Sequence, residues 1–146
     1  MGRMIFVIAA GVSLFASILV GQGRLEIRAA ATSPVSGWQQ LPAPDPSTVL
    51  WVSPTNQLTA VDVERIAPSK QADGRAAVTV VLTDAGARKM AEFSAGQIGK
   101  PLAILLDGKV ISAPIVRVVI QKEGTITGGP NGLTPDEVQR LLAILK

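Results

Sequence analysis

The chain has 146 residues, of which 47% are apolar and 3% aromatic, so it is long enough for one domain of ordinary size plus a tail or anchor, with a core built mainly from aliphatic side chains. It contains no His and no Cys, which removes the usual general base, thiol nucleophile and transition-metal ligands. The net charge is +3, but from position 32 onward eleven basic and ten acidic residues are scattered along the sequence, which argues against a nucleic-acid binder.

The chain begins with an uncharged apolar run from Met4 to Val20, preceded by Arg3. A basic residue followed by an apolar stretch is the pattern of protein export, and the run also reaches the lower limit of a membrane-spanning helix, about 17–25 residues. We therefore expect residues 1–28 to form a hydrophobic helix that is either a signal peptide or an N-terminal membrane anchor. Both possibilities place the rest of the chain outside the cytosol, in the cell envelope; a buried core helix is the remaining alternative.

A proline-rich stretch follows the apolar run. Residues 31–47 contain four prolines, with Ser, Thr, Gln and Gly between them. A segment of this composition is typically extended and solvated, because it has little to bury. The sequence therefore predicts a Pro-rich linker over residues 29–47 and a folded domain over residues 48–146.

The sequence predicts three strands followed by a helix in the first half of this domain. Strands are predicted over residues 48–52, 58–66 and 76–82, the last of them rich in β-branched side chains. A Thr-Asp pair can then cap a helix over about residues 85–97. The residues of this helix that we expect to face the core are Met90 and Phe93.

A β-hairpin is predicted around Asp107 and Gly108. The five apolar residues before this pair, Leu102 to Leu106, are typical of a strand that is buried on both faces. A two-residue type I′ turn needs positive φ at both central positions, which Asp tolerates and Gly adopts freely. Pro114 cannot donate a ladder hydrogen bond, so the return arm is expected to bend or split near it.

Two short strands, over residues 115–120 and 125–127, are predicted between the hairpin and a final helix. The sequence Thr134-Pro135-Asp136-Glu137 combines an N-cap, a proline at the first helical position and a capping-box glutamate. An apolar stripe follows at helical spacing, made of Val138, Leu141, Leu142 and Leu145. The predicted fold class is α+β: a small mixed or antiparallel β-sheet packed on two α-helices, preceded by the hydrophobic helix and the Pro-rich tether.

No catalytic, cofactor or metal site is predicted, so we expect a protein that is not an enzyme. Asp62 and Glu64 share one face of a predicted strand, but paired carboxylates in that pattern are typical of a solvated surface. The loop of residues 128–132 is glycine-rich and precedes a helix, yet it lacks the glycine motifs of phosphate-binding loops and its proline has no N–H to donate.

Five motifs stand in a distinctive order after residue 77: VTVVLTDAGA from Val78, IGKPLAILLDG from Ile98, ISAP from Ile111, ITG from Ile126 and the final helix with Glu137. Together they resemble the SecD/SecDF protein-export subunits, in the head subdomain of their first large periplasmic domain. The resemblance covers about residues 49–146 and implies an α+β head that contacts the emerging polypeptide. The base subdomain and membrane helices of that family are not in this sequence, so the resemblance does not imply translocase activity.

We therefore predict a cell-envelope protein that acts as an accessory or polypeptide-binding module related to protein export. Its expected partners are unfolded or translocating polypeptides or envelope export components, with membrane contact through the N-terminal segment and no nucleic acid. An envelope structural or assembly protein that uses the domain for self-association is the alternative. The candidate surface residues are Gly99, Lys100, Pro101, Asp107, Gly108, Pro114 and Gly128.

Overall fold

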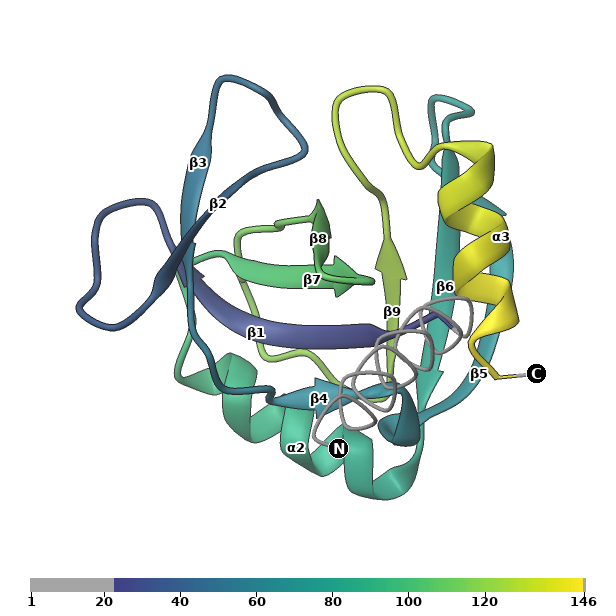
Figure 1. Ribbon diagram of the computed structural model, residues 1–146. Helices are drawn as coiled ribbons and strands as arrows, with labels where there is room; N and C mark the ends of the chain where they lie inside the picture. The colour runs from purple at the N-terminus through teal and green to yellow at the C-terminus, as the bar shows by residue number, and fades with distance from the viewer. Residues whose placement is uncertain (1–22, 146) are drawn as a thin grey trace, which may run out of the picture.

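The computed structural model describes residues 23–145 (Figure 1). The Met4 to Val20 run, predicted as a hydrophobic helix, lies outside these residues; among the helices that are described, none has the length and apolar character needed to cross a membrane. The described part is a mixed α+β fold whose elements are β1 (Leu25–Ala31), β2 (Gln39–Pro42), β3 (Val49–Val52), β4 (Leu58–Thr59), the 3-10 turn η1 (Ala60–Asp62), β5 (Val63–Lys70), β6 (Ala76–Leu82), α2 (Asp84–Ala95), β7 (Leu102–Leu106), β8 (Lys109–Ser112), β9 (Glu123–Ile126) and α3 (Pro135–Ala143).

β7 lies inside the larger sheet, whose strands are ordered β2-β3-β1-β7-β8, with β4 also paired to β1. Every pairing in this sheet is antiparallel. All five residues of β7 are buried, as predicted from their continuous apolar run. Leu102, Ile104 and Leu106 belong to the main core, whereas Ala103 and Leu105 join a smaller cluster with residues of β3.

A second antiparallel sheet has the order β5-β6-β9. The main core lies where side chains of this sheet, such as Val78 and Ile126, meet those of β1 and β7. Helix α3 runs beside β5 and β6, and α2 lies against β4, η1 and β6 (Figure 1). The described residues therefore form two sheets rather than the single sheet that the sequence predicts, because an apolar pattern identifies a strand but not the strand it pairs with.

The described strands differ from two predicted segments, because β1 includes residues 25–28 of the predicted leader, and β1 and β2 include parts of the predicted linker over residues 29–47. β1 pairs with β3, β4 and β7, and β2 pairs with β3. Leu25 and Ile27 enter the main core, while Glu26, only 6% exposed, accepts a hydrogen bond from Arg28 Nη2 at 2.9 Å. This paired charge lets a strand with two ionised residues lie within the sheet. The folded domain therefore includes β1 as well as the residues from 48 onward.

Residues 115–120 do not form the predicted strand. β8 ends at Ser112, and beyond Pro114 an isolated bridge joins Ile115 to Pro101, so the return arm of the hairpin is split as expected. The N–H of Ile120 donates to the hydroxyl of Ser94 on α2, at 2.8 Å. This segment therefore contacts α2 instead of pairing in a sheet, although its composition is that of a strand. The next strand, β9, also begins two residues earlier than the predicted 125–127.

The predicted strand over residues 58–66 is interrupted by η1, which changes the surroundings of Asp62. This residue is 4% exposed, and its carboxylate accepts hydrogen bonds from the N–H of Thr59 at 3.1 Å and from Lys89 Nζ at 2.9 Å. Its partner in the predicted carboxylate pair, Glu64, is exposed on β5. Asp62 therefore caps a turn and pairs with α2, which corrects its expected position on a solvated strand face.

The hairpin turn and the start of the last helix are confirmed. Asp107 and Gly108 have φ of 53° and 85°, the positive values that the predicted turn needs. The capping box of α3 is present in both directions, between Thr134 and Glu137. The stripe is confirmed only in part: Leu141 is fully buried, but Leu145 lies beyond the end of α3 and is 42% exposed, while Ile144 packs against the core.

Candidate functional site

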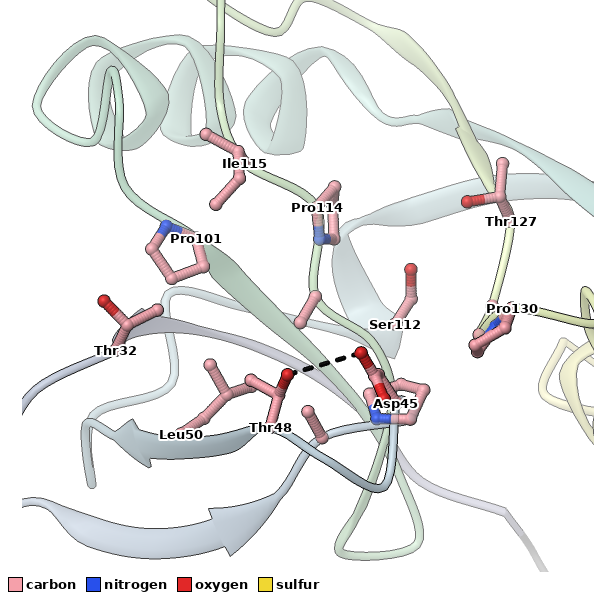
Figure 2. Close-up of a pocket in the computed structure, with 15 residues that line it drawn as sticks. Thr32, Asp45, Thr48, Leu50, Pro101, Ser112, Pro114, Ile115, Thr127 and Pro130 are labelled. Carbon is pink, nitrogen blue, oxygen red and sulfur yellow. Dashed lines mark hydrogen bonds between the residues drawn. The ribbon is translucent and has the colours of Figure 1, made fainter.

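An open cleft of about 330 Å³ brings together three of the seven candidate surface residues, namely Pro101, Pro114 and Gly128. Figure 2 shows Pro101 and Pro114 above the Asp45–Thr48 hydrogen bond, with Thr127 and Pro130 to their right. Five segments meet here: the residue that follows β1, the β2–β3 connection, the start of β7, the split return arm of the hairpin and the loop after β9. The other lining residues are Thr32, Ala43, Pro44, Leu50, Ser112, Ala113, Ile115 and Gly129.

The β2–β3 connection forms one wall as a hydrogen-bonded turn. The N–H of Ala43 donates to Thr48 O at 3.1 Å, and the N–H of Thr48 donates to Asp45 O at 3.0 Å. Asp45 Oδ1 accepts from the N–H and the hydroxyl of Ser47, at 3.0 and 2.8 Å. These hydrogen bonds, the backbone one first, lower the pKa of Asp45, so its carboxylate is ionised near neutral pH.

The wall opposite this turn is made by the two prolines of the hairpin motif. The N–H of Leu102 donates to Pro114 O at 3.0 Å, and the N–H of Val116 donates to Lys100 O at 2.9 Å, which fixes the split return arm against the start of β7. Neither proline has an N–H, so this wall offers few backbone donors to the cleft. Ile115, between the two bonded positions, is 41% exposed and adds an apolar side chain.

The loop after β9 requires glycine at two positions. Gly128 has φ of 75°, and a Cβ there would lie 2.8 Å from backbone atoms of Gly132 and Leu133. A Cβ on Gly129 would lie 2.9 Å from the Cβ of Pro44. This glycine loop therefore packs directly against the β2–β3 connection, and its two glycines set the width of the cleft at this side.

Asp107 and Gly108 lie at the other end of the hairpin, away from the cleft. Asp107 Oδ1 accepts from the N–H of Arg24 at 2.8 Å, and Oδ2 accepts from Arg140 Nη1 at 2.9 Å. The carboxylate thus ties together the start of β1, the hairpin turn and α3. The remaining two candidates, Gly99 and Lys100, are exposed on the connection from α2 to β7 and lie beside the cleft in sequence without lining it.

A second depression, of about 430 Å³, opens between residues 118–121 and β9 onto side chains of the main core. Val118 and Val119 on its rim are 71% and 39% exposed. The sequence does not predict this depression or the part that Asp45 plays in the first cleft. Asp45 falls in the predicted linker, and no pattern around it indicates that it meets the hairpin motif.

Comparison with known proteins gives consistent matches. A family model described as SecDF, P1 head subdomain, matches residues 38–146. The chain is 42% identical over 72 residues to protein translocase subunit SecD of Rhodobacter capsulatus, which covers 49% of this chain and 13% of that protein. It is also 42% identical over 73 residues to SecD of Aquifex aeolicus, covering 50% of this chain and 14% of that protein. The chain thus spans only a small part of the curated relatives it matches.

Solved structures give the same result. A crystal structure of SecDF in super-membrane-facing form aligns with a TM-score of 0.66 and 26% identity, over 89% of this chain and 20% of that one. A structure described as that of a membrane component SecDF that enhances protein export aligns with a TM-score of 0.65 and 25% identity, over 91% of this chain and 66% of that one.

Proposed function

The chain belongs to the SecDF P1 head subdomain family, and on that basis we propose that it serves protein export at the cell envelope as a non-enzymatic module that holds extended polypeptide segments. Membership of this family supports the proposed role in protein export. Binding of polypeptide in the cleft at Pro101, Pro114 and Gly128 is the proposal. Self-association as the main role is not favoured, because the relatives named above are protein translocase subunits.

The observation that supports the proposal is that Pro101, Pro114 and Gly128 line one cleft. They come from three separate motifs through which the sequence resembles the family. Its lining is made of small, proline and hydroxyl-bearing residues with few large side chains. Such a surface suits an extended chain of varied sequence, because it contacts the main chain and small side chains without requiring one particular residue. Ile115 and Leu50 supply the apolar contacts.

The proposed location is the extracytoplasmic side of the membrane. The apolar run from Met4 to Val20 would act there as an export signal or as an anchor, and β1 begins only five residues after it. Membrane fractionation with mass spectrometry of the native N-terminus tests this part. Recovery of the intact chain from the soluble cytoplasm would contradict it.

The binding proposal is tested on the full chain in a mild non-ionic detergent, because a fragment that begins at residue 48 would lack β1. Unfolded polypeptide is titrated into the isotopically labelled protein, and amide resonances are followed. We expect shifts at Ile115, Thr127 and their neighbours, and we expect Ile115→Glu to abolish them. Val61→Glu is the matched control, because Val61 is an equally apolar residue, 80% exposed on η1 and absent from the cleft lining. No shifts at high polypeptide concentration, or equal effects of both variants, would contradict the proposal.

A further inference from the structure

The cleft has an asymmetric charge. Among the described residues that line it, Asp45 is the one with an ionisable side chain. The Arg75 guanidinium donates to the carbonyl oxygen of the lining residue Pro130 and is paired with Asp73, so its charge is already balanced. Among the described lining residues, the Asp45 carboxylate is therefore the charge that a bound segment meets.

Several backbone groups of the lining cannot donate a hydrogen bond to a bound segment. Pro44, Pro101, Pro114 and Pro130 carry no N–H, and the N–H groups of Ala43 and Thr48 are already bonded within the β2–β3 connection. Asp45 Oδ2 accepts one long hydrogen bond in the described structure, from the Thr48 hydroxyl at 3.4 Å. Because a carboxylate has about four lone-pair positions, this oxygen can accept a further donor.

We propose that the cleft prefers extended segments that carry a lysine or arginine, with the cationic side chain bound by Asp45. This inference rests on the proposed polypeptide binding and adds the class of segment that binds. A cationic side chain supplies the positive charge and the N–H donors that the Asp45 carboxylate can accept. In Figure 2 the Asp45 carboxylate lies beside Thr48 at the edge of the cleft, where a long side chain can reach it from a segment running past Pro101 and Pro114.

The solvent exposure of Asp45 limits how strongly the cleft can prefer a cationic segment. Asp45 is exposed, and ion pairs at exposed sites change binding by no more than about two- to fivefold. The preference should also fall as salt is added, because the Debye length shortens from about 10 Å at 0.1 M to about 3 Å at 1 M.

The test compares short peptides of Ala, Ser, Thr and Leu that differ only at a central position, which is Lys, norleucine or Glu. Binding to the full chain in non-ionic detergent is measured by fluorescence anisotropy. We expect the Lys peptide to bind about two- to fivefold more tightly than the norleucine peptide at low salt, and the Glu peptide to bind more weakly than both. The difference between Lys and norleucine should vanish in Asp45→Asn, whose amide oxygen can keep the hydrogen bonds from Ser47.

Asp84→Asn is the matched control, because Asp84 is also exposed but lies on α2, outside the cleft, and should leave the Lys preference intact. Equal binding of the Lys and norleucine peptides to the unaltered protein, or a Lys preference that survives in Asp45→Asn, would overturn the inference while the proposed polypeptide binding stands. Absence of binding by all three peptides would overturn both.

Discussion

Replacing Asp107-Gly108 by Ala-Ala should lower the free energy of unfolding by about 2–3 kcal/mol. Gly108 has φ of 85°, where an alanine costs about 1–2 kcal/mol, whereas Asp107, at φ of 53°, already bears most of this cost in the native protein. The substitution also removes the carboxylate that accepts from the N–H of Arg24 and from Arg140. The Arg24 N–H that loses its acceptor adds about 1 kcal/mol, whereas the ion pair with the half-exposed Arg140 side chain adds little.

Urea unfolding of the full chain in mild detergent, followed by the fluorescence of Trp38 and Trp51, measures this loss. Asp107→Asn is the control, because Asn tolerates positive φ and keeps the turn while losing only the ionic contact with Arg140. It should change the free energy of unfolding little. If the Ala-Ala variant cost no more than Asp107→Asn, the reasoning from backbone strain at this turn would be refuted.

Three further predictions concern the rest of the fold. Ser94→Ala should cost about 1–3 kcal/mol, because it removes the acceptor of the Ile120 N–H; hydrogen exchange at Ile120 should rise, and unchanged protection would count against this contact. Burial alone would raise the pKa of Glu26, but hydrogen bonds with Arg28 and Asn56 lower it. The stability that Glu26 contributes is therefore complete above its ordinary pKa of 4.5 and is lost as the pH falls through the lowered pKa of the folded state. Glu26→Gln should remove that part of the acid dependence, measured as the melting temperature against pH. A fragment from residue 48 should show no dispersed amide spectrum, whereas one from residue 23 should be folded.

The elements that were predictable are those whose signals are local. The Asp107-Gly108 turn requires positive φ, and the capping box of α3 lies within four consecutive residues, so both could be identified without knowledge of any distant contact. β6 was predicted with its observed bounds, because β-branched residues dominate it.

The elements that were missed depend on distant contacts. β1 follows an apolar run and contains Glu26 and Arg28, so it resembles the charged flank of a leader; its burial depends on pairing with β7, more than 70 residues away. Residues 115–120 have the composition of a strand, but Pro114 interrupts the ladder and the Ser94 hydroxyl binds the N–H of Ile120. No local pattern indicates either contact.

The sequence likewise indicates some residues of the candidate site and not others. The resemblance pointed to Pro101, Pro114 and Gly128, and these three line one cleft. The same motif also contains Asp107, which instead holds α3 and the start of β1 together. Asp45 was not found, because its segment has the composition of a linker, and its position in the cleft depends on the contact between Pro44 and Gly129.

Site-specific crosslinking tests the central claim, that this cleft is where the protein contacts polypeptide, most directly. The chain has no cysteine, so Ile115→Cys and Val61→Cys each provide one thiol for a photoreactive label on the full chain in detergent. With an unfolded polypeptide present, we predict strong crosslinking from position 115 and little from position 61. Equal yields from both positions, or crosslinking from position 61 alone, would contradict the account.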